Sequence, residues 1–493
     1  MVHLRKPEKS LGCFPISLVS VKGGVTWGFR RKLSPQVVHC VVGTSYNKRR
    51  PIDSPRAFTY KKELSLMKSL AIQCLTCGLL VCGLVLAATM AHAEDWPRFR
   101  GPSAAGQTSA TDVPLTWSDS ENILWKVEMP GPGASSPVIL GDRLYLTCYT
   151  GYGLSEESPG EKGDLKRHLL CFNKGNGELI WNTPLAGTEA DTEDYRGFVA
   201  LHGFTSSTPV VDETGIYVFY GTAGAAAYSH EGELLWNTPL GTKTHTFGTA
   251  NSPVLYKDLV IVNAGVESGA IVALNKKTGE KVWQWEGVTR SWNTPILVEA
   301  EGGTELVFND QKLVRGINPE NGEELWKCEA IDDYICPSVI AVGDMLYAVG
   351  ARQNKTVAIK AGGRGDVTET HLVWELNKGS NVSSPSYHEG HLYWVSEGKG
   401  IAYCANAETG ELVYEERLDP RPGRIYASPV VAAGHLIYVS RDKGTYVLPA
   451  KPEYEVVAHN TFESDDSIFN GSPAVVDNKM YLRSDKAIYC LGK

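Results

Sequence analysis

The nine residues GELIWNTPL at 177–185 return almost unchanged as GELLWNTPL at 232–240, fifty-five positions later. Related stretches follow as TGEKVW at 278–283, NGEELW at 321–326 and TGELVY at 409–414. An Asn-Gly or Thr-Gly pair supplies the positive φ that a tight hairpin turn needs. Each copy is therefore predicted to be a turn followed by one strand of a repeated unit.

The repeat extends on both sides of this nonamer. A Ser/Thr/Cys-Pro pair opens an apolar run eight times, and six of the seven spacings fall between 42 and 48 residues, the first being 72. Proline is tolerated at the first residue of a strand, where no ladder hydrogen bond is lost. The eight prolines that are predicted to open strands are Pro137, Pro209, Pro253, Pro295, Pro337, Pro385, Pro429 and Pro473.

Each unit holds four short apolar runs in about 44 residues, which is the pattern of a β-propeller blade. The fourth run carries a tryptophan in most units, and Tyr414 takes that place in one of them. We therefore predict an all-β, eight-bladed propeller with four antiparallel strands in each blade. The tryptophans predicted to be structural are Trp125, Trp181, Trp236, Trp283, Trp326 and Trp374.

The two ends of the repeat region predict how the ring closes. The last unit stops at AIYCLGK, 487–493, without a fourth strand, whereas NILWKVEM at 122–129 is a spare strand with Trp125 in register. We expect this N-terminal strand to complete the C-terminal blade. An open solenoid is the alternative, but it would need capping repeats at its ends.

The region before the repeats divides into three parts. Residues 1–66 are a basic extension, interpreted as a mis-called start or a disordered segment. Residues 67–93 combine Lys68, an apolar run and an A-x-A pattern, which predicts a signal peptide cleaved after Ala93. A transmembrane anchor is the alternative. Residues 94–121 form an N-terminal arm, and the propeller occupies 122–493. The mature protein is then expected in the periplasm or outside the cell, without a membrane span.

Charge excludes one broad class of partner. The net charge is -8 at pH 7, and no basic stripe marks the repeat region. A nucleic-acid binder is expected to carry such a stripe. We therefore expect a protein partner from the envelope or the extracellular space, or a small ligand, and a chain that is a monomer or one subunit of a complex.

The unit ALNKKTGEKVW at 273–283 resembles the pyrroloquinoline-quinone-like (PQQ-like) propeller repeat, a relative of WD40-like and YVTN-like repeats. The resemblance covers nearly all of 120–493. Members of this superfamily include the quinoprotein alcohol dehydrogenases and BamB, the propeller lipoprotein of the outer-membrane assembly machine. The opening DWPRFRGP at 95–102 is similar to the start of many secreted bacterial proteins with this repeat.

The resemblance does not extend to the catalytic motifs of the quinoprotein dehydrogenases. In the quinoprotein dehydrogenases the pattern includes an adjacent Cys-Cys pair, carboxylate and Asn ligands for calcium, an Asp base and often a CxxCH haem motif. Neither the Cys-Cys pair nor CxxCH occurs in residues 94–493. We therefore expect no catalytic residue, no metal and no cofactor. The alternative is an oxidoreductase that uses PQQ with calcium.

Loop geometry predicts where a partner would bind. The two longest insertions, 149–168 and 186–206, fall where loops of a propeller share one face, and binding groups concentrate on loops. The connections on that face carry aromatic and arginine side chains toward the channel, a composition that suits a partner or an anionic ligand. The alternative is that these aromatic and arginine side chains only fill the centre of the propeller and have no binding role. A polysaccharide-binding or polysaccharide-cleaving accessory protein is a further alternative. The candidate binding residues are His202, Phe204, His245, Arg290, Trp292, Tyr334, Arg424 and Tyr426.

The six cysteines of residues 94–493 allow two disulfides in an exported protein. Cys148 and Cys171 lie on neighbouring strands of one blade, and Cys328 and Cys336 flank one connection between blades. Free buried thiols are the alternative, because spacing alone does not fix connectivity.

Overall fold

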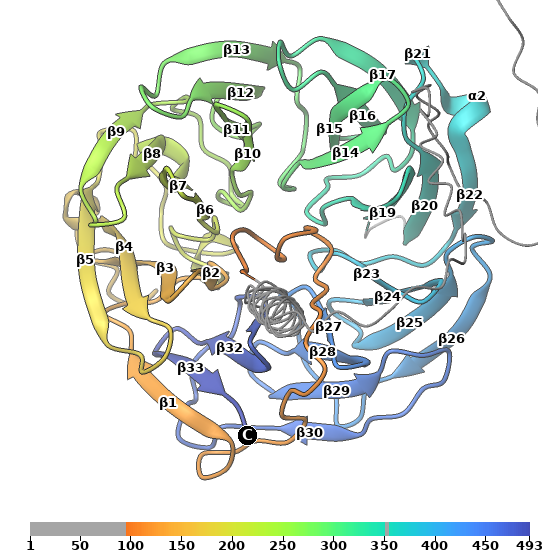
Figure 1. Ribbon diagram of the computed structural model, residues 1–493. Coiled ribbons are helices and arrows are strands. Elements are labelled where there is room, and N and C mark those ends of the chain that lie inside the picture. The colour runs from red at the N-terminus through yellow and green to blue at the C-terminus, as the bar shows by residue number, and fades with distance from the viewer. Residues whose placement is uncertain (1–94, 351–353) are drawn as a thin grey trace, which may run out of the picture. The chain divides into compact units, whose positions relative to one another are not determined.

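The computed structural model describes residues 95–350 and 354–493. Their strands form eight sheets arranged as a ring around a central channel, as Figure 1 shows. This confirms the all-β, eight-bladed propeller. The predicted basic extension, the signal segment and its cleavage site after Ala93 lie outside the described residues.

Each blade runs from an inner strand beside the channel to an outer strand on the rim (Figure 1). The inner strands are β2 (Val138–Leu140), β6 (Val210–Asp212), β10 (Val254–Tyr256), β14 (Ile296–Ala300), β18 (Ile340–Val342), β23 (Ser386–His388), β27 (Val430–Ala432) and β31 (Ala474–Val476). The second strands are β3 (Arg143–Thr150), β7 (Gly215–Phe219), β11 (Leu259–Ala264), β15 (Gly303–Asn309), β19 (Met345–Gly350), β24 (His391–Val395), β28 (His435–Val439) and β32 (Lys479–Arg483).

The outer half of each blade is built in the same way. The third strands are β4 (Lys166–Asn173), β8 (Ala225–Tyr228), β12 (Ala270–Asn275), β16 (Leu313–Ile317), β20 (Lys355–Lys360), β25 (Ile401–Asn406), β29 (Thr445–Pro449) and β33 (Ala487–Leu491). The outer strands are β5 (Leu179–Ala186), β9 (Leu234–Thr238), β13 (Lys281–Glu286), β17 (Glu324–Glu329), β22 (Leu372–Leu376), β26 (Leu412–Arg417), β30 (Ala458–Asn460) and β1 (Ile123–Glu128).

Strand burial follows from the stacking of blades. The middle strands are buried on both faces, as in β12 and β33, because a neighbouring blade covers each side. Their sequences are accordingly continuous apolar runs. The outer strands alternate between exposed and partly buried residues, as in β1 and β22. The core therefore lies between blades: Tyr217 and Phe219 of β7 share one cluster with Val260 and Val262 of β11.

The ring closes through its first strand. β1 pairs antiparallel with β33, and Trp125 lies opposite Cys490. Strand β1 thus supplies the fourth strand of the blade that begins with β31. The predicted closure is confirmed, and it joins the two ends of the repeat region by a hydrogen-bonded ladder rather than by a loop.

One blade departs from the regular pattern between its third and fourth strands. There the chain forms β21 (Gly365–Asp366) and the short helix α2 (Thr368–His371) before β22. Strand β21 pairs in parallel with β17 of the preceding blade, and Gly365 lies opposite Trp326. The short 3-10 helices of the described chain are η1 (Lys162–Asp164), η2 (Val199–Leu201) and η3 (Gly221–Ala223).

The repeated tryptophans connect neighbouring blades. Five of the six donate an indole N–H to a carbonyl in the turn before the outer strand of the next blade. These bonds are Trp125 to Lys174 (3.2 Å), Trp181 to His230 (2.9 Å), Trp236 to Lys276 (2.9 Å), Trp283 to Pro319 (3.0 Å) and Trp374 to Ala407 (3.0 Å). Trp326 instead donates to Glu305 of its own blade at 2.6 Å, because the next blade has the β21–α2 segment where the others have their turn.

Candidate functional site

The N-terminal arm crosses the channel at one end. Figure 1 shows this segment, in orange, running across the middle of the ring. Trp96 forms a backbone bridge with Ile139 on one side, and Gln107 forms one with Val431 on the other. The Pro97 carbonyl also accepts the Val211 backbone N–H in β6, and Arg100 reaches Pro385 beside β23, so the arm joins blades on opposite sides of the ring.

Arg100 anchors the middle of the arm. Its Nη2 donates to the Pro385 carbonyl at 2.5 Å, to the Ala105 carbonyl at 3.0 Å and to Ser386 Oγ at 3.0 Å. The side chain is buried, and burial lowers its pKa. The neighbouring Phe99 lines the channel cavity. The stretch DWPRFRGP thus supplies both the anchor and the floor of the cavity.

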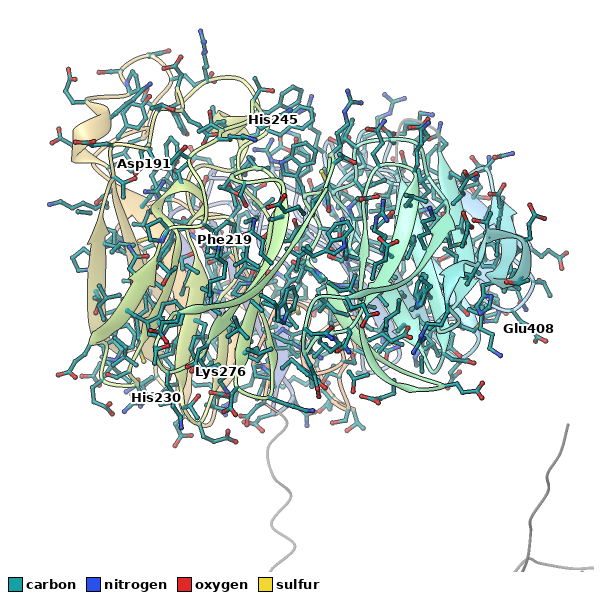
Figure 2. All side chains as sticks on the ribbon, turned by 90° about the horizontal axis from the view of Figure 1, so that it is seen from above. Asp191, Phe219, His230, His245, Lys276 and Glu408 are labelled. Carbon is teal, nitrogen blue, oxygen red and sulfur yellow. The ribbon has the colours of Figure 1, made fainter. Side chains whose placement is uncertain are left out.

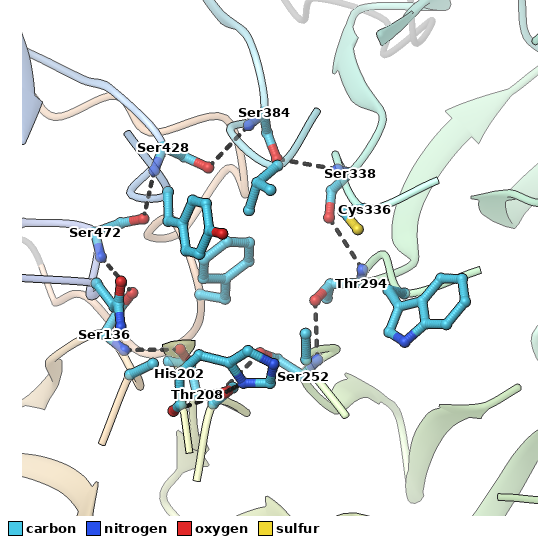
Figure 3. Close-up of a pocket in the computed structure, with 18 of the residues that line it drawn as sticks. Ser136, His202, Thr208, Ser252, Thr294, Cys336, Ser338, Ser384, Ser428 and Ser472 are labelled. Carbon is cyan, nitrogen blue, oxygen red and sulfur yellow. Dashed lines mark hydrogen bonds between the residues drawn. The ribbon is translucent and has the colours of Figure 1, made fainter. Parts of the chain in front are cut away.

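A closed ring of hydrogen bonds surrounds the channel above this floor. In every blade a Ser or Thr hydroxyl accepts the backbone N–H of the corresponding residue in the preceding blade, as the dashed lines of Figure 3 show. All eight distances lie between 2.9 and 3.0 Å. We call these residues the hydroxyl ring: Ser136, Thr208, Ser252, Thr294, Ser338, Ser384, Ser428 and Ser472.

The ring corrects the predicted register of one blade. The sequence pattern aligns Pro337 with the other prolines, each of which directly follows its hydroxyl residue. In the structure Ser338 occupies the ring position, and Pro337 precedes it. Strand β18 accordingly begins at Ile340, two residues after the ring hydroxyl, as the inner strand of every other blade does. The hydroxyl fixes the register because it makes the bond between blades, whereas the proline makes none.

The channel holds a cavity of about 170 Å³ between the arm and the opposite face. The eight hydroxyl-ring residues contribute to its wall. Every side chain of the described lining is apolar or neutral and polar. The other lining residues are Phe99, Ala134, Phe198, His202, Ser206, Phe247, Ala250, Trp292, Tyr334, Cys336, Asn381, Val382, Tyr426 and Asn470.

Four of the eight candidate binding residues line this cavity: His202, Trp292, Tyr334 and Tyr426. Two hydrogen bonds hold His202: its Nε2–H donates to the Phe247 carbonyl at 2.7 Å, and Nδ1 shares a hydrogen bond with Ser206 Oγ at 2.6 Å. Burial lowers its pKa. This imidazole therefore shapes the wall in a fixed orientation.

The other four candidates lie outside the cavity. Phe204 packs edge-on against Tyr149 beneath the insertions, with ring centroids 5.3 Å apart. His245 packs edge-on against Trp292, with ring centroids 4.8 Å apart. Arg424 faces Glu397, with Nε and Oε1 3.6 Å apart. Arg290 does not contribute to the lining. The pattern therefore identified the correct connections, but not which side chains turn inward.

The two insertions pack together on one face of the propeller. The guanidinium of Arg167, at the start of β4, binds both carboxylate oxygens of Asp191 at 2.5 and 3.0 Å. Figure 2 shows Asp191 and His245 on this face, and His230 and Lys276 on the opposite one. We call the former the insertion face.

The insertion 186–206 also reaches across the channel mouth. The carbonyl of Leu201 accepts from Arg441 Nη2 at 2.7 Å and from Asn470 Nδ2 at 2.8 Å. Arg441 lies between β28 and β29, and Asn470 lies just before β31, in the last two blades of the ring. The two side chains also bond each other at 2.9 Å. The sequence could not predict either bond to the Leu201 carbonyl. Every residue has a backbone carbonyl, so the residue type does not indicate which carbonyl will accept a hydrogen bond.

Aromatic side chains gather beside the mouth. Phe198 is half exposed and lies 4.9 Å from Phe247 between ring centroids. Phe247 in turn contacts Trp292 at 5.3 Å and Tyr334 at 5.1 Å. Leu154, in the insertion 149–168, is also exposed, at 55%. The insertion face thus carries two exposed apolar side chains, one of which continues a packed aromatic cluster.

Two carboxyl groups lie at this face, one buried and one half-buried. Glu267, between β11 and β12, is 1% exposed, and Thr249 donates to its Oε1. Burial raises the pKa of Glu267 to about 7. Glu193 of the insertion accepts the His245 backbone N–H at 3.3 Å, and burial raises its pKa also. Glu267 is held away from water, so its charge depends on pH near neutrality.

A family model described as outer membrane protein assembly factor BamB matches residues 165–362 and 310–452. The chain belongs to this BamB-like PQQ-repeat family. The family explains the repeated Gly-Glu turn and Trp strand, and it is consistent with the closed eight-bladed ring.

Similar proteins show how far this propeller is shared. The outer membrane protein assembly factor BamB of Shewanella oneidensis is 22% identical over 344 residues, which are 65% of this chain and 78% of that protein. The crystal structure of BamB from Moraxella catarrhalis superimposes with a TM-score of 0.54 at 12% identity, over 75% of this chain and 97% of that one. A europium-containing methanol dehydrogenase gives 0.56 at 10% identity, over 81% and 98%. At these identities the solved structures share the fold alone.

The disulfides allowed by the sequence are corrected by the structure of this BamB-like chain, in which all six described cysteines are free. Cys171 lies opposite Tyr145 in the ladder between β3 and β4. Cys148 is therefore three residues further along, about 10 Å away and on the other face of the sheet. Cys328 is buried in the outer strand β17, whereas Cys336 lines the channel.

The cavity of this family member does not fit a PQQ–calcium pair. Calcium takes oxygen ligands that include carboxylates, and the described lining contributes none. PQQ itself carries several carboxylates, yet the described lining holds no cationic side chain to pair with them. Outside the cavity, the described residues also hold no cluster of three acidic, His or Cys side chains suited to a metal.

Helices contribute little to this molecule. None of those formed by the described residues has the length and apolar character that a bilayer crossing requires.

Proposed function

We propose that this BamB-like propeller is an exported scaffold that binds a protein partner on its insertion face. The signal-like segment 67–93 supports export to the periplasm or the exterior. The relatives named as outer membrane protein assembly factors support a role in holding other proteins. The scaffold acts as a monomer or as one subunit of a larger complex.

The exposed Phe198 is the observation that carries this proposal. A half-exposed phenylalanine loses hydrophobic free energy in water unless a partner covers it, and aromatic anchors dominate binding energy at interfaces. Phe198 is also preorganised, because Phe247 packs edge-on against it at 4.9 Å. Arg441 and Asn470 hold the neighbouring Leu201 in place. A partner would therefore meet a rigid apolar anchor rather than a loose loop.

Site-specific crosslinking tests the proposal. A photoreactive amino acid at Phe198 is compared with one at Leu235, which is equally exposed on the outer strand β9. We expect a discrete adduct from position 198 in cells that express the chain, and none of that mass from position 235. The crosslinked protein is then purified, and Phe198→Ala should weaken its binding at least tenfold. Equal adducts from both positions would refute a docking site on the insertion face.

We further propose that the scaffold works without a resident cofactor. The neutral lining of the channel supports this, because neither calcium nor the carboxylates of PQQ would find a charged partner there. The purified chain 94–493 is titrated with PQQ, with and without calcium, while tryptophan fluorescence is followed. No saturable quenching is expected up to millimolar PQQ. Calcium-dependent quenching at micromolar PQQ would instead favour the oxidoreductase alternative.

A further inference from the structure

We propose that the channel cavity binds one neutral sugar ring, either a free monosaccharide or the terminal unit of a glycan. This inference goes beyond the scaffold function, because the cavity lies beneath the insertion face and does not need a protein partner. The proposal rests on three features: the hydroxyl-ring side chains lack hydrogen-bond acceptors among the described residues, aromatic side chains line the cavity, and the N-terminal arm closes one end of the channel.

The hydroxyl ring leaves donors directed at the cavity. Each ring oxygen accepts one backbone N–H, and no described residue accepts the hydrogen of any of these hydroxyls. The ring residues are at most 9% exposed, and a buried hydroxyl without an acceptor costs about 1–3 kcal/mol. A ligand or water with several acceptor oxygens would therefore satisfy them together.

The cavity also offers a buried acceptor. Asn381 lines the wall, and its Oδ1 has no hydrogen-bond partner among the described residues. The hydroxyl ring and Asn381 thus belong to the same wall. A polyhydroxyl compound matches both, because each of its hydroxyls donates and accepts.

Shape and charge narrow the ligand further. Trp292, Phe247 and Tyr426 supply aromatic surface for the apolar face of a ring. The described lining has no charged side chain, so an anionic or cationic ligand would be desolvated without compensation. A hydrocarbon would leave the ring hydroxyls unpaired. A neutral sugar avoids both penalties.

The floor limits the ligand to one ring. Phe99 and the anchored arm block the end opposite the mouth, so a polymer cannot thread through the channel. A volume of about 170 Å³ is below the roughly 300–1,000 Å³ of sites for drug-sized ligands. One hexose-sized ring therefore enters, and any further units of a glycan stay at the mouth.

Calorimetric titration of the chain tests this site with glucose, galactose, mannose and N-acetylglucosamine. Glucuronate is the charged control and cyclohexanol the apolar one. At least one neutral sugar should bind with a Kd below about 10 mM, and both controls at least tenfold more weakly. A disaccharide that ends in the sugar that binds distinguishes the two sources. If it binds with the same affinity as the monosaccharide, the ligand is the end of a glycan; if its affinity is much lower, the ligand is a free monosaccharide.

Two variants of similar chemistry locate the binding. Asn381→Leu removes the buried acceptor and should weaken sugar binding at least tenfold. Asn237→Leu makes the same change on the exposed face of β9 and should leave the Kd unchanged. Thermal unfolding shows that both variants are folded. No binding of any neutral sugar at 100 mM, equal binding of glucuronate, or equal effects of the two variants would overturn the proposal. Crosslinking at Phe198 is unaffected by any of these results, so the two proposals fail separately.

Discussion

Gly279 lies directly against the indole of Trp236 from the preceding blade. A Cβ added to Gly279 would stand 2.6 Å from Cδ2 of that indole, and the φ of Gly279 is +71°. The same relation joins Gly177 to Trp125, Gly232 to Trp181, Gly322 to Trp283 and Gly410 to Trp374. In these five pairs the glycine and the tryptophan of the repeated stretch form one contact between neighbouring blades, in which the tryptophan of one blade packs against the glycine of the next.

We predict that Gly279→Ala lowers thermal stability clearly more than Gly343→Ala. Both glycines have positive φ, which costs about 1–2 kcal/mol for alanine. At Gly343 no atom lies within 4 Å of the added Cβ, so the strain stands alone. At Gly279 the indole must also move, and overpacking typically adds about 1–3 kcal/mol. Scanning calorimetry at a fixed scan rate measures the Tm of both variants. Equal Tm losses in Gly279→Ala and Gly343→Ala would show that the contact between Gly279 and Trp236 does not contribute to stability.

The register of the irregular blade predicts a second contrast. Ser338→Ala removes the acceptor of the Thr294 backbone N–H, and an unsatisfied buried donor costs about 1–3 kcal/mol. Cys336→Ala removes only a free thiol beside the cavity. Ser338→Ala should therefore lower the midpoint of urea unfolding, and Ser338→Thr should restore it, since threonine occupies two ring positions. If Cys336→Ala lowered the urea midpoint more than Ser338→Ala, Cys336 rather than Ser338 would occupy the ring position, as the proline pattern predicts.

The buried acid Glu267 gives a pH dependence with a defined sign. Burial raises its pKa from 4.5 to about 7, so between pH 4.5 and 7 the folded state binds more protons than the unfolded state. The free energy of unfolding therefore falls as pH rises through this window. The loss is at most about 3 kcal/mol, from about 1.4 kcal/mol per unit of pKa.

Glu267→Gln should remove this loss. The variant is expected to gain stability relative to the wild type at pH 8, but not at pH 4.5. Urea unfolding at several pH values measures the difference. Glu320→Gln is the control, because that carboxylate is exposed and pairs with Lys257 on the surface. A wild-type-to-variant difference that is constant with pH would mean that the pKa of Glu267 is the same in the folded and unfolded states.

The repeat explains why the fold was predictable. Trp236 and Gly279 belong to a short-range pattern that recurs with a fixed spacing, and strand count and closure follow from counting its copies. The insertion face was also predictable, because loop order assigns the two insertions to the same side. Seven of the eight hydroxyl-ring residues directly precede a proline, so the recurring proline predicts their register. In the stretch Cys336-Pro337-Ser338 the hydroxyl follows the proline instead, and the proline pattern predicts the wrong register there.

Side-chain direction at the site was not predictable in the same way. Phe204 and His202 are two residues apart, yet one packs under the insertions and the other shapes the cavity wall. The arm contributes Phe99 to the floor only because Arg100 reaches Pro385 across 285 positions of sequence. Contacts of such separation depend on the closed ring, and a single sequence contains no local signal for them.

The ion pair between Arg167 and Asp191 should control the order of the insertion face. Both side chains are nearly buried, at 3% and 6% exposure. Burial alone would raise the pKa of Asp191, but the hydrogen bonds and charge of Arg167 outweigh it, and the pKa lies below its ordinary value. Removing one partner of a buried pair costs about 3–5 kcal/mol, because the other charge stays uncompensated.

Asp191→Asn should therefore loosen the insertion 186–206 while the blades stay folded. Arg196 is 81% exposed in this insertion, so trypsin cleavage after it reports loosening directly. We expect cleavage at least tenfold faster than in the wild type, together with weaker partner binding, because Phe198 would lose its fixed position. Glu189→Gln is the matched control: it lies two residues away in the same insertion and is exposed, so its neutralisation removes no buried charge. If both variants were cleaved at the same rate, the buried pair would not be what holds the insertion against the propeller.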